Sequence, residues 1–123
     1  MRAYEKDPEL RAEFARLQRG FLESAVSGVD EVFQIIDDAG EAVPAGEAGR
    51  RLRTIAHGLR GAGGSYGFDA VTSTAGELEE AFLAGKPAPA LRDVAIGLGA
   101  AVRAARNAIE AAVEARVTET EAG

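Results

Sequence analysis

Cysteine and tryptophan are absent from this sequence, and histidine occurs once. Without cysteine the chain can form neither disulfide bonds nor zinc sites with thiolate ligands, and redox chemistry gives no clue to its compartment. No segment reaches the roughly 18–20 consecutive apolar residues that a membrane-spanning helix needs. The first ten residues also lack the apolar stretch of a secretory signal. We therefore expect a cytoplasmic protein that does not associate with membranes.

Features of nucleic-acid-binding proteins are also scarce. Acidic side chains outnumber basic ones by 20 to 14, which gives a formal net charge of −6. A protein that binds the phosphate backbone needs a positive field instead. Aromatic residues make up only 6% of the chain, too few for a surface on which bases could stack. We therefore do not expect nucleic acid as a partner.

The pattern of apolar residues indicates an all-α protein. No segment alternates apolar and polar residues as a half-buried strand does. The chain has 123 residues, enough for one domain with one hydrophobic core but too few for a kinase catalytic domain. We expect a single domain over residues 1–123, with its core in about 13–115 and a polar, frayed tail over 117–123.

The first predicted helix is the longest. Asp7 and Pro8 form a good helix start, because a side-chain cap precedes a residue whose missing N–H costs nothing there. Gly40 marks the end of this predicted helix. Apolar residues recur at steps of three and four and predict one core-facing stripe: Leu10, Phe14, Leu17, Phe21, Ala25, Val29, Val32 and Ile36. The segment is either one helix over about 7–39 or two helices broken near Gly20 or Gly28.

Three more helices are predicted after a loop over residues 40–47. They span about 45–66, with Gly67 ending the helix; about 69–83, with Asp69 as a cap; and about 90–116. The same spacing predicts their core-facing residues: Val71, Ala75, Leu78 and Phe82, then Leu91, Val94 or Ala95, Leu98, Val102, Ala105, Ile109 and Ala112. Such helices pack most simply as an antiparallel four-helix bundle. An extra short N-terminal helix remains open.

The segment around the single histidine has an unusual solvent face. On a helical wheel, the core-facing residues lie roughly opposite His57: Leu52, Ile55, Leu59 and Tyr66. Basic residues and glycines lie within roughly 60° of the histidine: Arg50, Arg53, Arg60, Gly61 and Gly64. His57 is therefore predicted to point into solvent.

Two features of this face are costly. Each glycine inside a helix costs roughly 1 kcal/mol relative to alanine, and four lie in or near this helix: Gly58, Gly61, Gly63 and Gly64. Glycine beside the histidine would let another protein approach closely. Three arginines on one stripe repel one another unless an anion or an acidic partner is bound there part of the time.

An exposed imidazole suits phosphoryl chemistry. Unperturbed imidazole titrates near pH 6.5, so its neutral, nucleophilic form is abundant at pH 7. A ring nitrogen can attack a phosphoryl group and hold it as a labile phosphoramidate. Arg53 and Arg60, one turn before and one turn after His57, are placed to offset the negative charge.

Other kinds of site fit the sequence less well. One histidine, no cysteine and basic neighbours do not make a metal site. The glycine-rich run over residues 61–67 has neither the spacing nor the preceding strand of a nucleotide-binding loop. His57 could also serve Ser65 as a base, but we find no residue in the sequence that would orient the ring.

The motif Ala56-His57-x-Leu59-Arg60-Gly61, with Gly67 ten residues after the histidine, resembles the signature of histidine-containing phosphotransfer (Hpt) domains. These are four-helix bundles that carry phosphoryl groups in multistep two-component signalling. Segment 21–36 resembles the family's first long helix, and Leu78-Glu79 resembles the end of its third. The resemblance covers roughly residues 13–115.

The resemblance implies roles for individual residues. His57 would accept the phosphoryl group, and Arg60 would neutralise its oxygens where the family usually has lysine. Gly61 would keep the histidine accessible, and Gly67 would close the helix. The partner-binding surface would be completed by four further residues: Arg50, Arg53, Gly58 and Gly64.

Two departures from the family pattern bear on the lifetime of the phosphoryl group. Arginine at position 60 is larger than lysine and binds oxygens in pairs. Gly64 stands where a polar residue is common, so a hydrogen bond to the phosphoryl group is missing.

The expected function is that of a phosphoryl carrier without kinase activity of its own. It would receive the group on His57 from a receiver-domain aspartate, or from a sensor or hybrid histidine kinase, and pass it to another receiver domain. It would be a monomer without a cofactor, because Mg²⁺ belongs to the partner receiver domain. Two alternatives stay open: a non-catalytic helical adaptor that binds a signalling partner through the same Arg/Gly face, and a phosphotransfer module of a larger kinase.

Overall fold

The computed structural model describes residues 7–122, with side chains described for residues 7–115. This part of the chain is helical throughout, apart from short connections. Its elements are α2 (Pro8–Ala39), α3 (Gly46–Gly63), the 3₁₀ turn η1 (Gly64–Tyr66), α4 (Asp69–Leu83) and α5 (Ala88–Ala122). The predicted all-α class is confirmed.

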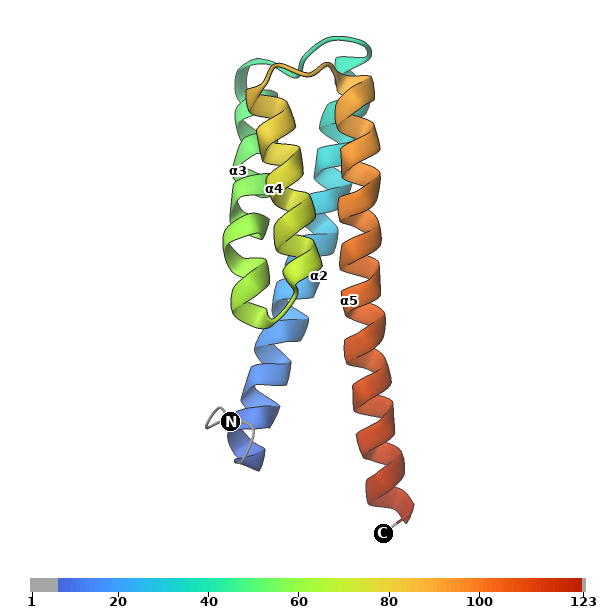
Figure 1. Cartoon of the computed structure of the whole chain (residues 1–123). Helices are drawn as coiled ribbons and strands as arrows, with labels where there is room; N and C mark the ends of the chain where they lie inside the picture. Colours follow the sequence, from blue (N-terminus) through green and yellow to red (C-terminus); the bar gives the residue numbers. More distant parts are fainter. Residues whose placement is uncertain (1–6, 123) are drawn as a thin grey trace.

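The four helices form an antiparallel bundle (Figure 1). Helices α2 and α4 each pack against both α3 and α5, whereas the backbones of α3 and α5 do not come close to each other within the described residues. The free ends of α2 and α5 extend past the end of the α3–α4 hairpin and diverge there (Figure 1). Helix α3 therefore has one face toward the core and one face open to solvent.

Most helix boundaries agree with the sequence predictions. The carboxylate of Asp7 accepts hydrogen bonds from the backbone N–H groups of Glu9 and Leu10, and Pro8 begins α2. Helix α2 is continuous, so no break occurs at Gly20 or Gly28. An extra N-terminal helix could lie only in residues 1–6, which are outside the described part of the chain.

Two boundary predictions were wrong, at the start of α4 and at the end of α5. Asp69 is the first residue of α4 rather than its cap, and Phe68 precedes it without a side-chain capping bond. The predicted end at Gly67 is confirmed, since η1 continues α3 to Tyr66 and Gly67 reverses the chain with a φ of 86°, although the last turn is 3₁₀ rather than α-helical. Helix α5 begins at Ala88 and continues through the tail that we expected to fray, since neither glycine nor proline occurs between Gly99 and Gly123.

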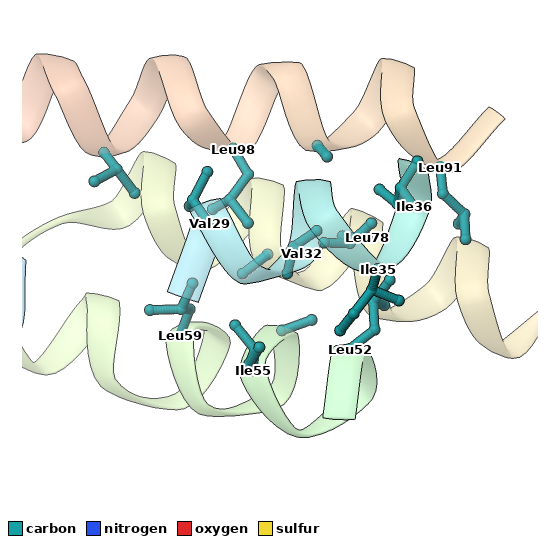
Figure 2. Packing of buried hydrophobic residues seen from close by; sticks show 14 of the residues in the cluster. Val29, Val32, Ile35, Ile36, Leu52, Ile55, Leu59, Leu78, Leu91 and Leu98 are labelled. Atoms are coloured by element: carbon teal, nitrogen blue, oxygen red, sulfur yellow. The ribbon is translucent and has the colours of Figure 1, made fainter. Parts of the chain in front are cut away.

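The core fills the space between the four helices (Figure 2). Large, fully buried side chains come from every helix: Val32, Ile36, Leu52, Val71, Leu78, Leu91, Leu98 and Val102. Leu10 and Leu17 are 46% and 48% exposed, so their predicted burial was wrong. Both belong to the N-terminal part of α2 and the exposed Ala112 to the C-terminal part of α5, and these are the two helix ends that extend past the α3–α4 hairpin (Figure 1). The stripe therefore continues past the last neighbour that could cover it.

Two glycines allow α3 to approach its neighbours closely. A Cβ atom on Gly63 would lie 2.6 Å from Oγ1 of Thr72 in α4, and one on Gly49 would lie 2.7 Å from the carbonyl oxygen of Pro44. Both distances are shorter than real Cβ contacts, so these positions need glycine. The close approach brings α4 against the histidine-bearing turns of α3.

Candidate functional site

The imidazole of His57 stands on the open face of α3. Its side chain is 73% exposed. Leu52, Ile55 and Leu59, which lie on the other side of the helix, are buried in the core. The exposed position agrees with the helical wheel of the sequence, and it follows from an apolar stripe on only one side of the helix.

One ring nitrogen of His57 is held by the protein. Its Nδ1 atom lies 2.8 Å from Oε2 of Glu79 in α4. The carboxylate side chain is only 5% exposed. An ionised carboxylate only accepts hydrogen bonds, so this contact assigns the ring proton to Nδ1 and leaves the lone pair on Nε2. Our expectation that nothing orients the ring was therefore wrong.

Two arginines share the same carboxylate. Nη1 of Arg60 donates to Oε1 of Glu79 over 3.1 Å, and its Nη2 lies 3.9 Å from the carboxylate of Glu80. Nε of Arg53 lies 3.8 Å from Oε2 of Glu79, beyond hydrogen-bond length. The Arg60 side chain also lies on Gly76, where a Cβ would be 3.4 Å from its Nε. One buried carboxylate thus holds His57 and Arg60 by hydrogen bonds and attracts Arg53 at longer range.

The ionisation of Glu79 follows from these contacts. Burial raises the pKa of its carboxyl group, but hydrogen bonds from His57 and Arg60, together with their Coulombic attraction, lower it by more. The net pKa is below the ordinary value for glutamate. Glu79 is therefore a carboxylate at neutral pH and remains an acceptor for the Nδ1 proton.

The open side of His57 borders a shallow hollow. It is lined by Arg50, Arg53, Thr54, His57 and Gly58. A longer groove between α2 and α3 shares Thr54 and Gly58 with it. Arg60 lines neither depression, because its guanidinium is turned toward Glu79.

The glycines beside His57 face open space. A Cβ atom on Gly58 or on Gly61 would have no atom of neighbouring segments within 4 Å. Alanine would therefore fit the fold at both positions and would favour the helix. Gly64 is exposed, but it belongs to η1 beyond the end of α3. Its backbone dihedral angles stay in the right-handed helical region, with φ of −64° and ψ of −35°.

A family model of the Hpt domain matches residues 27–117, about three quarters of the chain. No curated protein and no solved structure gives a significant match. The chain belongs to the Hpt domain family. Hpt domains are phosphoryl carriers of two-component signalling and in general lack kinase activity. The match begins inside α2, so the part of that helix before residue 27 lies outside it.

Within this Hpt domain, Glu79 is the residue of the site that sequence reasoning missed. It lies four residues after Ala75 and eight after Val71, on the buried side of α4. A carboxylate on an apolar stripe needs a partner, because an unpaired buried charge is very costly. A glutamate at a core position of the apolar stripe of α4 is therefore the sequence signal that could have identified Glu79.

No metal-binding cluster accompanies the site. Within the described residues, no group of three or more histidine, aspartate or glutamate side chains could hold a metal ion together. Across residues 7–122, no helix of this Hpt domain combines the length and apolarity needed to cross a bilayer.

Proposed function

We propose that this Hpt domain carries a phosphoryl group on Nε2 of His57. It receives the group from the aspartate of a receiver domain, or from a sensor or hybrid histidine kinase, and passes it to another receiver domain. The observation that carries the proposal is the asymmetry of the ring. Nδ1 is bound to the buried Glu79, whereas the side chain as a whole is 73% exposed.

The chemical step needs only the nucleophile from this chain. The Nε2 lone pair attacks the phosphorus of an aspartyl phosphate, and the bond between phosphorus and the aspartate oxygen breaks with its electron pair on the carboxylate. The ring keeps its Nδ1 proton and becomes positively charged as the N–P bond forms. The Glu79 carboxylate, 2.8 Å from Nδ1, stabilises that charge. The reverse step returns the phosphoryl group to an aspartate.

The surroundings of His57 suit a visiting protein. Gly58 and Gly61 leave the ring uncovered on the face of α3, and the adjoining groove between α2 and α3 offers further contact area. We place the receiver domain over this surface. The carrier itself acts as a cytoplasmic monomer without a cofactor, and the Mg²⁺ that phosphoryl transfer requires is supplied by the receiver domain.

The test is transfer of a radiolabelled phosphoryl group from a phosphorylated receiver domain to the purified protein. We expect label on the wild type and none on His57→Gln. The label should resist alkali and be lost in acid, as phosphohistidine is, and incubation with ATP alone should give none. Equal labelling of both proteins would overturn the proposal. Stable binding of the receiver domain without any label would support the adaptor function instead.

A further inference from the structure

A phosphoryl group on Nε2 of His57 would bring about two negative charges to the open face of α3. The Glu79 carboxylate is on the Nδ1 side of the ring and adds a third negative charge nearby. A cation must therefore offset the phosphoryl oxygens on the Nε2 side. The family resemblance assigns that part to Arg60, and the geometry of the site argues for another residue.

Arg60 is already engaged. Its Nη1 donates to Glu79 at 3.1 Å, its Nη2 lies 3.9 Å from the carboxylate of Glu80, and its side chain lies against Gly76. If Arg60 moved to the phosphoryl group, the buried carboxylate of Glu79 would lose one of its hydrogen-bond donors. It also does not line the hollow beside His57.

Arg53 is in the opposite situation. It lies one turn before His57 and lines the same hollow as the ring. Within the described residues its guanidinium contacts one carboxylate, Glu79, over 3.8 Å, and its side chain is 56% exposed. That contact is too long for a hydrogen bond, so moving the guanidinium costs little. Arg50 also lines the hollow, but it lies two turns from His57, roughly 10 Å along the helix axis.

We infer that Arg53, and not Arg60, binds the phosphoryl oxygens on His57, while Arg60 keeps Glu79 ionised and in place. This inference rests on the proposed function, since it assigns a residue to the same phosphohistidine. The guanidinium of Arg53 donates to two phosphoryl oxygens, and arginine makes such paired contacts well.

Loading with potassium phosphoramidate tests this assignment without a protein partner. The P–N bond of the reagent breaks, ammonia leaves with the electron pair, and an N–P bond forms on Nε2. We would follow the gain of one phosphoryl group by intact mass, and its loss after the reagent is removed. The variants are Arg53→Gln, Arg53→Lys, Arg60→Gln and Arg103→Gln, with His57→Gln as the blank. Arg103 is an exposed arginine of α5, the helix whose backbone does not come close to α3 within the described residues.

Arg53→Gln should load at least about tenfold more slowly than the wild type, because the paired charge-assisted hydrogen bonds to the phosphoryl oxygens are lost, with an unchanged melting temperature. Arg53→Lys should recover part of that loss. Arg60→Gln should show the reverse pattern, with a lower melting temperature and a smaller loss of loading rate, about twofold. Arg103→Gln should load as the wild type does.

The outcomes separate the two proposals. If the wild type loads at His57 and Arg53→Gln loads as fast as Arg103→Gln, the inference about Arg53 is wrong and the proposed function stands. The inference is also wrong if Arg60→Gln loses as much rate as Arg53→Gln or more. If the wild type gains no more phosphoryl than His57→Gln, the proposed function itself fails.

Discussion

Four glycines in the interior and at the end of α3 belong to two groups that differ in what surrounds them. At Gly49 and Gly63 an added Cβ would lie within 2.7 Å of neighbouring atoms, whereas at Gly58 and Gly61 it would meet nothing within 4 Å. Packing within the chain explains the first pair. The second pair weakens the helix by roughly 1 kcal/mol per residue and returns nothing to the fold. We interpret the open pair as an adaptation to a surface outside this chain.

The two nitrogens of His57 differ in the same way. Nδ1 faces the buried carboxylate of Glu79, and the rest of the ring is largely in solvent. One side of α3 is thus specified by packing and hydrogen bonding, and the other is left open for a partner. Substitutions on the two sides should consequently have opposite profiles of stability and transfer.

The largest effect is expected for a bulky residue on the open side. Gly61→Glu and Gly61→Arg should each slow transfer from a receiver domain by on the order of a hundredfold, because a long side chain would separate the two proteins. The melting temperature should not fall, since space around Gly61 is open. Ala104→Glu, on an exposed position of α5, is the matched control. Normal transfer by Gly61→Arg would show that bulk at this position does not matter.

The next largest effect is expected when the charge on Glu79 is removed. Glu79→Gln keeps the shape of the side chain but weakens its hydrogen bonds to His57 and Arg60. We expect a loss of about 2 kcal/mol in the free energy of unfolding at pH 7, the range for hydrogen bonds to charged groups. Glu77→Gln, an exposed neighbour on α4, should change stability by much less.

The difference in unfolding free energy between the wild type and Glu79→Gln should depend on pH in a defined direction. Burial raises the pKa of Glu79, but its hydrogen bonds and charge partners lower it by more, so the folded pKa lies below the unfolded one. The stabilisation is then complete above the unfolded pKa, about 4.3, and is lost as the pH falls through the folded pKa. The gap between wild type and Glu79→Gln should therefore narrow in acid. Denaturant titrations over a pH series would measure it, and a gap that widened in acid would contradict this interpretation.

On the packed side, Gly49→Ala tests whether glycine is required. The added Cβ would lie 2.7 Å from the backbone carbonyl of Pro44, which cannot rotate away as a side chain does. We expect a net loss of about 1–2 kcal/mol, because overpacking outweighs the better helix propensity of alanine. Thermal unfolding would measure it. A higher melting temperature than wild type would remove the distinction between the two groups of glycines.

The sequence was sufficient to predict the features that depend on one helix at a time. The four helices, the start of α2 at Pro8 and the exposed position of His57 follow from periodicity, capping residues and glycine or proline signals. The motif around His57 also indicated the family that the match over residues 27–117 established.

Features that depend on contacts between helices were not predictable in this way. Glu79 lies 22 residues after His57, and a wheel of α3 alone contains no information about α4. For the same reason Arg60 was placed beside the histidine, whereas its guanidinium contacts Glu79. The exposure of Leu10 and Leu17 has the same cause, since an apolar stripe does not show where neighbouring helices end.

The smallest effect, and the most direct test of the comparison, is expected for Gly58→Ala. Because nothing lies within 4 Å of the added Cβ, the variant should gain about 1 kcal/mol of stability from helix propensity and melt a few degrees higher. Its methyl group projects into the surface where we place the receiver domain, so transfer should slow about twofold. Gly97→Ala in α5, where a Cβ would meet only Thr74 at 4.0 Å, should gain similar stability without slower transfer. Greater stability together with slower transfer at position 58, but not at position 97, would show that this glycine serves a partner. A destabilised Gly58→Ala protein would mean that the fold itself requires glycine there.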